Sequence, residues 1–577
     1  MTLVAPSTTL SSPRSQIIYP LSVARLCGLG IWQGKFISLD RFQGYIVQID
    51  PASENVCILN QQQVDVFRDS NGLTVQDDTL WFTKGTRVYA CDLQTWEITY
   101  VAEVRDRAEG VAISGNTLYV SNSRLGLIFV VSAANGNLIT QFRAPGVGVE
   151  HLAARAEELW VADQGEQTVY CLDRATGEQR FSLLTPFEHP SGLQFLPRSA
   201  PAAVTNTAGS GQTTAAASEQ PTDQIFVLYS SEQLYIQDDP NGYEPHRLAR
   251  RDRSLIQPLH YSYRPGKPYA LSNGYRLELC YVEELAPLDP VALENVEWRI
   301  ALPSNTDRQR VVSVEPFGLP FEVVEQEGEK VAVFRFEKLQ EHDRLVFGWR
   351  AIIDTYGIKY QLLPKDVDLT EEFSEEFKAR YLVDNENLAM DTPIVQWAAK
   401  EAVGTETNPL RQILSIRDYV YDRLSYRITP HIDNPDVVLE RGTGSCGEYV
   451  GVLLALCRLN GIACRTVGRY KCPQHPELLQ VPLFPDYNHV WLEFYLPGIG
   501  WLPMESNPDD VDYGPHPMRF FMGLAWYHAE IGRGLKFEQV FSQGTNIKEL
   551  PGDLSIGNLS VNHVRFRIME ELIPPTA

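Results

Sequence analysis

A repeat of about 40 residues runs through the first half of the chain and limits the folds available to it. Each unit begins with a small or polar residue followed by Leu or Val, and these anchors are 44, 38, 41 and 41 residues apart. A second strand-like segment follows in each unit, as in Thr79–Thr83, and then a third and a fourth. Four short strands per repeat of this length are typical of a β-propeller blade. The five anchors are Gly28, Gly72, Gly110, His151 and Gly192.

These units predict an N-terminal β-propeller over residues 15–253. We count five units, and the segment Gln16–Tyr19 is placed to close the ring with the last one, so five and six blades both stay open. His151 and Asp163 are candidates for lining a central channel, although turn or surface positions are the simpler interpretation. No ligand set repeats, so we interpret the propeller as a platform that binds a protein partner.

Two segments have compositions that predict disorder. Residues 1–14 are rich in Ser, Thr and Pro, and we expect a disordered tail. Residues 199–223 are low in complexity and lack aromatic side chains, so they cannot bury a core. Because residues 199–223 fall between two strands of the last repeat, they form an insertion rather than a linker between domains.

Period-two alternation of apolar and polar residues begins near Ser254 and continues for about 100 residues. Val296–Leu302 and Lys330–Phe336 are two such segments, and turns such as Gln326–Glu329 separate them. The pattern predicts an antiparallel, immunoglobulin-like β-sandwich over residues 254–364. We assign no chemistry to this domain.

The stretch Gly444–Arg458 is the strongest candidate for chemistry. Cys446 lies among small residues and opens an apolar run in which Val450, Leu453 and Leu454 follow helical spacing. Cys446 is therefore predicted at a helix N-terminus, where the helix dipole favours the thiolate, the nucleophilic form of cysteine. A cysteine beside a buried helix is more often part of the core, so this stretch alone leaves both roles open.

Two downstream segments favour the catalytic role. Tyr487–Leu496 reads as a strand with a histidine, His489, at its start, and Trp501–Asn507 reads as a return strand that ends in polar groups. A cysteine at a helix start, a histidine on a strand and a polar residue on the next strand are the parts of a thiol triad. The histidine takes the thiol proton, and the third residue fixes the histidine tautomer and stabilises the imidazolium.

The motifs around these residues jointly resemble the transglutaminase-like core. The resemblance covers about residues 398–507 and implies a papain-like thiol fold in a C-terminal catalytic domain, residues 365–577. It implies Cys446 as the nucleophile, His489 as the base and Glu505 as the orienting acid, at a position where the family usually has aspartate. The motifs are Arg441–Glu448, Leu459–Gly468, His489–Glu493 and Gly500–Glu505.

The length of the turn between the two strands decides which acid or amide can reach His489. A turn of two or four residues would place Glu505 on the opposite face from His489, because side chains alternate along a strand. A turn of three or five residues, or a bulge, places Glu505 on the same face, diagonal to His489. In that case His489 faces Asn507, so Asn507 remains a rival for the orienting role.

Length, charge and hydropathy limit the number of domains and the classes of partner that we expect. A chain of 577 residues should hold three or four domains, and a net charge of −23 argues against nucleic acid or an anionic membrane as partner. No apolar run reaches the length of about 18 residues needed to cross a membrane, and Met1–Ser15 does not resemble a signal peptide.

The cysteines predict a reducing compartment. The nine residues are scattered and odd in number, which argues against a disulfide framework, so we expect a cytoplasmic protein with reduced thiols. Cys464 and Cys472, near His475, match no common zinc spacing. We therefore predict neither a metal nor a cofactor.

The predicted activity is cysteine-dependent acyl transfer on protein or peptide amides, which ends in hydrolysis or transamidation. The Cys446 N–H is the expected first oxyanion donor, and Tyr426 is a candidate for the second. One alternative is a non-catalytic scaffold with a vestigial triad, in which Cys446 would react no faster than the other cysteines. Another is a propeller-centred lactonase or lyase, which requires a metal or a converged set of acids and histidines.

Overall fold

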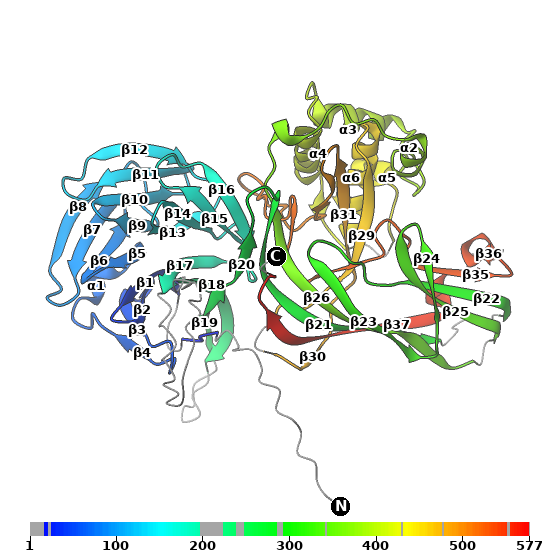
Figure 1. Ribbon diagram of the computed structural model, residues 1–577, viewed down its shortest axis with the longest axis horizontal. Helices are drawn as coiled ribbons and strands as arrows, with labels where there is room; N and C mark the ends of the chain where they lie inside the picture. The colour runs from blue at the N-terminus through cyan, green and yellow to red at the C-terminus, as the bar shows by residue number, and fades with distance from the viewer. Residues whose placement is uncertain are drawn as a thin grey trace, which may run out of the picture. The chain divides into compact units, whose positions relative to one another are not determined.

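The computed structural model is mostly β-structure with few helices, and it divides into two compact units, Met1–His260 and Tyr261–Ala577 (Figure 1). The predicted tail, residues 1–14, and all but the last residue of the predicted insertion, 199–223, lie outside the described residues. The structure describes residues 17–20, 25–196, 223–237, 247–285, 292–340, 343–428, 431–475, 478–550 and 554–575.

In its described part, the first unit contains five antiparallel sheets that follow one another along the chain. Four of them have four strands each, paired in sequence order, and the fifth has three. A single short helix, α1 (Val64–Phe67), lies between the first two sheets in the sequence. The strands of the first two sheets are β1 (Leu26–Trp32), β2 (Lys35–Asp40), β3 (Tyr45–Ile49), β4 (Val56–Ile58), β5 (Ser70–Gln76), β6 (Thr79–Lys84), β7 (Arg87–Asp92) and β8 (Ile98–Glu103). Those of the other three are β9 (Val111–Ser114), β10 (Thr117–Asn122), β11 (Leu127–Ser132), β12 (Leu138–Arg143), β13 (Val149–Arg155), β14 (Glu158–Asp163), β15 (Thr168–Asp173), β16 (Gln179–Leu184), β17 (Pro190–Leu196), β18 (Gln224–Gln237) and β19 (Arg247–Leu259).

The repeat anchors lie where consecutive sheets approach each other closely. A Cβ atom on Gly110 would stand 2.3 Å from the Glu150 carbonyl oxygen in the next sheet, so only glycine fits there. At the fourth anchor, the buried His151 ring places Nε2 3.2 Å from the Leu193 carbonyl oxygen of the following sheet. His151 therefore joins two sheets rather than standing exposed in a channel.

Asp163, the other channel candidate, is buried at the end of β14. Its carboxylate accepts hydrogen bonds from the backbone N–H groups of Gly148 and Glu166, at 2.9 and 2.8 Å. Burial first, and then the neighbouring charge of Glu166, raise the pKa of Asp163 to about 7. These contacts give Asp163 a structural role.

The first and last sheets of this unit are in contact. Ser191 Oγ donates to the Leu26 carbonyl oxygen at 3.2 Å, linking β17 to β1. Ile18 forms an antiparallel bridge with Ile256 of β19, with 2.9 Å hydrogen bonds in both directions. The segment ahead of the first repeat thus pairs with the last strand of this unit.

The second unit contains two large antiparallel sheets that pack through aromatic side chains. Trp298 of one sheet and Phe347 of the other meet edge to face, with ring centroids 5.2 Å apart. One sheet has the strand order β23-β26-β21-β37-β30, and the other has the order β24-β25-β22-β35-β36. In the first sheet, β20 also pairs with β21, and β33 with β26. The strands are β20 (Tyr261–Tyr263), β21 (Tyr269–Leu285), β22 (Ala292–Ala301), β23 (Gln309–Gly318), β24 (Glu322–Gln326), β25 (Glu329–Gln340), β26 (Leu345–Tyr360), β30 (Pro482–Leu483), β33 (Gly523–Leu524), β35 (Glu538–Ser542), β36 (Thr545–Asn546) and β37 (Ser560–Leu572).

Strands from the end of the chain complete both of these sheets. β37 pairs with β21 along most of its length, and β35 pairs with β22. The segments predicted as separate domains, 254–364 and 365–577, therefore share two sheets. Five strands that follow the candidate cysteine in the sequence belong to these two sheets. The two large sheets therefore form the framework to which the segment with the candidate site is joined.

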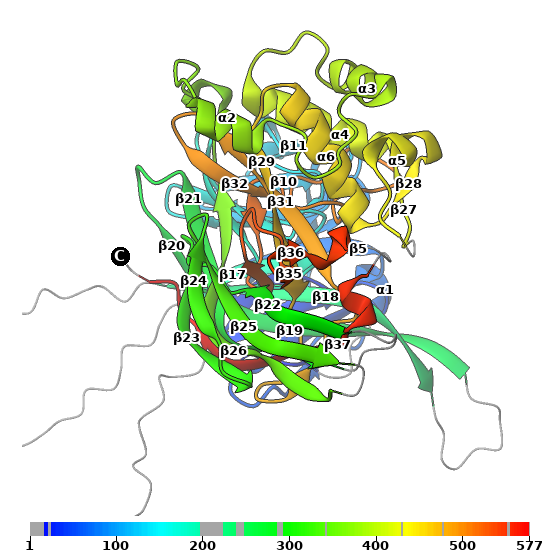
Figure 2. The same cartoon turned by 90° about the vertical axis from the view of Figure 1, so that its right-hand side faces the viewer.

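A smaller sheet and five helices hold the candidate catalytic residues. The sheet has the order β32-β31-β29-β34, and α6 packs against β31 and β29 (Figures 1 and 2). The helices lie together in both views, and α3, α4, α5 and α6 share a core with this sheet. The helices are α2 (Glu375–Tyr381), α3 (Pro393–Val403), α4 (Pro409–Arg423), α5 (Pro435–Arg441) and α6 (Cys446–Leu459). The strands are β29 (Cys464–Lys471), β31 (His489–Leu496), β32 (Gly500–Met504) and β34 (His528–Ile531), and the short pair β27 (Ser425–Tyr426) and β28 (Thr443–Gly444) lies before α6.

Within the described ranges, no helix combines the length and the apolar character that a membrane crossing requires.

Candidate active site

Cys446 is the first residue of α6, as its sequence context predicts. Glu448 fixes the start of this helix, because its carboxylate accepts hydrogen bonds from the backbone N–H of Ser445 at 2.7 Å and of Asp433 at 3.0 Å. Arg441 pairs with the same carboxylate at 2.8 Å. The reciprocal capping contact and the ion pair hold the N-terminal turn of α6 in place around the buried thiol.

His489 opens β31 and turns one ring nitrogen toward an acid. Its Nε2 lies 2.8 and 3.0 Å from the two carboxylate oxygens of Glu505. The other nitrogen, Nδ1, is buried and has no nitrogen or oxygen partner among the described residues. Since Glu505 occupies Nε2, Nδ1 is the atom left to interact with the Cys446 thiol.

The electrostatics of the pair favour charge separation. Burial would raise the pKa of the Cys446 thiol, but the hydrogen bond and charge of His489 and the Val490 N–H together bring it below its ordinary value. Burial would lower the pKa of His489, but the charge of Glu505 and the contact with Cys446 raise it. A thiolate beside an imidazolium is the form that these two shifts favour.

Glu505 is buried and surrounded by donors. Besides His489, its carboxylate accepts from Lys471 Nζ at 2.5 Å, from His528 Nε2 at 2.7 Å and from the Ser506 N–H at 2.9 Å. Burial would raise the pKa of this carboxyl, but the charges of His489 and Lys471 and the hydrogen bonds from both histidines hold it well below its usual range. Glu505 is therefore ionised at neutral pH.

The turn between β31 and β32 has the odd length that this contact requires. Tyr495 pairs with Trp501 and Leu496 with Gly500, which leaves a three-residue turn. His489 consequently bonds to Glu505. Asn507, the rival orienter, accepts instead from Ser506 Oγ at 2.8 Å.

Motifs that are far apart in the sequence hold one another around Glu493, which strand alternation places on the same face of β31 as His489. Glu493 of β31 is buried and accepts from Arg465 at 2.7 Å and from Arg533 at 3.1 Å. The Arg465 guanidinium also lies 4.1 Å from the centre of the Trp501 ring. These contacts hold β29, β31 and β32 together, four residues along β31 from His489.

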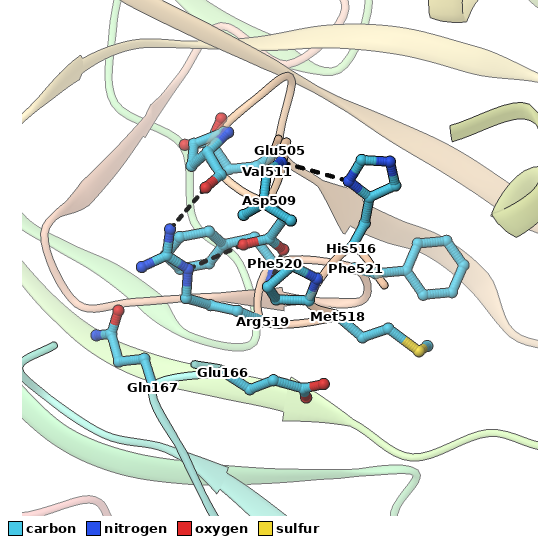
Figure 3. A network of polar contacts seen from close by, with 12 residues as sticks. Glu166, Gln167, Glu505, Asp509, Val511, His516, Met518, Arg519, Phe520 and Phe521 are labelled. Carbon is cyan, nitrogen blue, oxygen red and sulfur yellow. Dashed lines mark hydrogen bonds and ion pairs between the residues drawn. The ribbon is translucent and has the colours of Figure 1, made fainter. Parts of the chain in front are cut away.

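The loop after Glu505 is held by a second polar network (Figure 3). Asp509 accepts from Arg519 Nε at 2.9 Å and from the Phe520 N–H at 2.8 Å, and the Val511 N–H donates to His516 Nδ1 at 3.3 Å. The Glu505 N–H in turn donates to the Phe520 carbonyl oxygen at 3.2 Å. This network holds the end of β32 in place, directly before Glu505.

Two tyrosines lie close to the candidate catalytic pair. Tyr426 pairs with Gly444 in the parallel β27–β28 bridge, just before Cys446. Burial, followed by the charges of Cys446 and Tyr487, raises the pKa of Tyr426 to about 12, so its hydroxyl stays protonated and able to donate. The Tyr487 ring centre lies 6.4 Å from that of His489.

Cavities adjoin the site through these tyrosines. Tyr426, Asn507 and His516 line a polar cavity of about 490 Å³. Tyr487 lines a more apolar cavity of about 660 Å³, together with Phe484 and strands of the large sheet. In the described part of the chain, no group of three or more His, Cys, Asp or Glu side chains is arranged to hold a metal ion.

Sequence reasoning did not identify two residues of this site, Lys471 and His528. Lys471 lies two positions after Arg469, which is the β29 partner of His489, so strand alternation offered a weak signal for it. His528 lies in β34, and its approach depends on the pairing of β34 with β29, which no local pattern reveals.

Comparisons with known proteins locate one domain. Residues 396–506 match the model of the transglutaminase-like superfamily. A comparison with curated proteins found no match. Among solved structures, a candidate cysteine protease from Cytophaga hutchinsonii is 14% identical, with 52% of this chain and 100% of that chain covered and a TM-score of 0.35. Glutaminyl cyclase from Myxococcus xanthus is 12% identical, with 42% and 93% covered and a TM-score of 0.29. The family match encloses Cys446, His489 and Glu505, and residues 396–506 are a transglutaminase-like domain.

Proposed function

We propose that this protein is a cysteine-dependent enzyme that transfers acyl groups from protein or peptide amides to water or to an amine. Cys446 acts as the nucleophile, His489 as the base and Glu505 as the acid that orients His489. The contact of His489 Nε2 with Glu505 at 2.8 Å carries the proposal, since it directs the other ring nitrogen to the thiol at the start of α6.

In the first half of the reaction, the Cys446 sulfur attacks the amide carbonyl carbon and a tetrahedral oxyanion forms. The Cys446 N–H at the helix start is the first donor to this oxyanion, and the Tyr426 hydroxyl is the candidate for the second. The C–N bond then breaks, and the imidazolium of His489 gives its proton to the leaving amine. A thioester on Cys446 and a neutral His489 remain.

In the second half, the neutral His489 takes a proton from the acceptor as the acceptor attacks the thioester. Water gives a carboxylic acid, and an amine gives a new amide. The C–S bond then breaks and the sulfur leaves as the thiolate while His489 keeps the proton from the acceptor, which restores the thiolate–imidazolium pair. Glu505 holds the ring orientation through both steps and stabilises each imidazolium.

The first test is the pH dependence of Cys446 alkylation in the natural protein and in His489→Ala. The variant should raise the thiol pKa by about two units, because the imidazolium no longer stabilises the thiolate, and the alkylation rate at pH 7 should fall about 100-fold. Peptide mass mapping separates Cys446 from the other cysteines, and the exposed Cys57 serves as an internal control for the reagent.

An unchanged thiol pKa in His489→Ala would contradict the proposal and favour the scaffold interpretation. Where the shift is found, peptide amides are screened with water or a primary amine as acceptor. Hydroxylamine should capture the thioester as a hydroxamate, which identifies the acyl donor.

We further propose that the five sheets of the first unit form a five-bladed β-propeller that binds a protein partner. Its support is the order of the sheets along the chain and the contact of the first sheet with the last through Ser191 and Leu26. Exposed apolar side chains on outer strands, including Tyr100, Leu138 and Ile139, offer a surface for such a partner. Nine free thiols fit a reducing compartment, and we propose the cytoplasm.

A further inference from the structure

Glu505 is shared between two histidines and a lysine rather than serving His489 alone. His489 and His528 both place Nε2 within 3.0 Å of its carboxylate, and Lys471 Nζ approaches to 2.5 Å. A glutamate side chain has one more rotatable bond than an aspartate, so it requires more contacts to hold one orientation. His528 and Lys471 supply those contacts from two neighbouring strands.

Strand register places these groups on one sheet. Lys471 of β29 is the direct partner of His528 of β34, and Arg469, two residues earlier, is the direct partner of His489 of β31. All three groups that hold the carboxylate therefore come from regular strands. Such positions keep their geometry better than loops do.

His528 is a neutral donor. It is fully buried, and burial first, then the charge of Lys471, lower its pKa to about 3. A neutral imidazole has only one N–H. We place this proton on Nε2, because the contact of Nε2 with the Glu505 carboxylate, at 2.7 Å, is shorter than that of Nδ1 with the Ala525 carbonyl oxygen, at 3.2 Å. The rings of Trp491 and Tyr527 lie 5.2 and 4.7 Å away and hold its orientation.

The positive charge of Lys471 affects the protonation of His489 during the reaction. In the resting state, the charges of Cys446 and Glu505 are opposed by those of His489 and Lys471, so the cluster, in which Lys471 alone is partly exposed, is neutral. Once Cys446 carries an acyl group, its negative charge is gone, and a protonated His489 would leave the cluster with one excess positive charge. The low dielectric of a buried site makes that excess unfavourable, so His489 loses its proton.

We propose that Lys471 and His528 are positioning residues of the acyl-transfer reaction. Lys471 favours the neutral, base-competent form of His489 in the acyl-enzyme, and His528 holds the Glu505 carboxylate at His489. This inference rests on the proposed function, since it assigns roles within the same reaction. The titratable and charged groups that face this cluster are Cys446 on α6, His489 on β31, Lys471 on β29, His528 on β34, Glu505, Tyr421 on α4, Tyr426 on β27, Tyr487, and Arg308 beside His528.

The test for Lys471 is the pH dependence of Cys446 alkylation by iodoacetate. This anionic reagent reacts faster with the thiolate–imidazolium pair than with the thiolate alone, so its rate falls as His489 loses its proton. Lys471→Met keeps the length of the side chain and removes the charge. In this variant, the pH at which the rate decreases should rise by about one unit. Lys471→Arg keeps the charge and should restore the natural profile.

A second measurement follows the acyl-enzyme itself, with p-nitrophenyl acetate as the probe. Acetyl transfers to the Cys446 sulfur, p-nitrophenolate leaves, and water later releases acetate. In Lys471→Met the burst of p-nitrophenolate should persist, while the release of acetate at pH 7 should slow about tenfold because more of His489 stays protonated. An unmoved alkylation profile or an unchanged release rate would overturn the role of Lys471.

The role of His528 has a different signature. His528→Leu should lower the maximal rate of Cys446 alkylation about tenfold and leave unchanged the pH at which this rate decreases. The reason is that a neutral donor fixes the geometry of Glu505 and adds no charge. His528→Gln, whose amide can still donate to Glu505, should recover most of the rate. A loss that Gln does not rescue would contradict positioning.

These outcomes are separable from failure of the proposed function. If Cys446 alkylation does not depend on His489, the proposed function fails at once. If alkylation does depend on His489 but the Lys471 and His528 variants behave like the natural protein, the proposed function stands and the positioning roles fall. Thermal unfolding of each variant identifies any that fail to fold. If Lys471→Met is one of them, Lys471→Gln, which also removes the charge, carries the test, and His528→Gln does so for His528.

Discussion

Replacing Cys446 with alanine is expected to abolish acyl transfer, with kcat/KM lower by about 10⁴-fold or more. The reason is chemical, because the thioester forms on this sulfur and the neighbouring groups, His489, Glu505 and Tyr426, cannot form one. The thermal midpoint should change little, since alanine removes only the sulfur from a helix start that Glu448 holds independently. Turnover of the amide found in the screen and the burst with p-nitrophenyl acetate are the measurements.

Cys472 provides the matched control. It is as buried as a core residue, it directly follows Lys471, and burial raises the pKa of its thiol well above the usual range. Cys472→Ala should therefore keep full activity with a modest loss of stability. Activity that survives in Cys446→Ala, or that disappears equally in both variants, would show that the reaction does not depend on the Cys446 thiolate.

The local parts of the site could be predicted from the sequence. The helix at Cys446 follows from apolar spacing, and a strand from His489 follows from its composition. The requirement for an odd turn, later met by the pairing of Tyr495 with Trp501, follows from strand alternation alone. Each of these inferences uses residues that are neighbours in the chain.

The parts that were missed depend on contacts between distant segments. His528 reaches Glu505 only because β34 pairs with β29, and strand pairing of this kind carries no local signature. The return of β35 and β37 to the sheets of β22 and β21 has the same cause. A boundary drawn near residue 365 from a change of periodicity cannot reveal that the last strands belong to the earlier framework.

The repeat in the first unit illustrates an intermediate case. Its period predicted sheets of four strands, and four of the five described sheets have that number. The reason for glycine at the anchors becomes visible only in three dimensions, where a Cβ on Gly110 would meet the Glu150 carbonyl oxygen. A period in sequence thus indicates the repeating element, while the contact between elements requires the structure.

The second large effect is expected on stability, from the buried Arg308. Its guanidinium pairs with Glu530 at 2.8 Å and donates to the carbonyl oxygens of His528 at 2.9 Å and of Ala525 at 2.7 Å. Burial lowers the pKa of Arg308 below its ordinary value, although the charge of Glu530 opposes this shift. Arg308 therefore ties a loop of the large β-framework to the strand that carries His528.

Arg308→Met should lower the free energy of unfolding of the second unit by about 3–5 kcal/mol, because it leaves the Glu530 carboxylate buried without its cation. Hydrogen exchange measured peptide by peptide in urea is the appropriate method, since a chain of two units need not unfold in one step. Arg310→Met, at an exposed position two residues away, should change the free energy of unfolding of the second unit by less than about 0.5 kcal/mol. Since His528 loses a support in Arg308→Met, the Cys446 alkylation rate should fall as well. A loss below about 1 kcal/mol with an unchanged alkylation rate would mean that β34 holds His528 without Arg308.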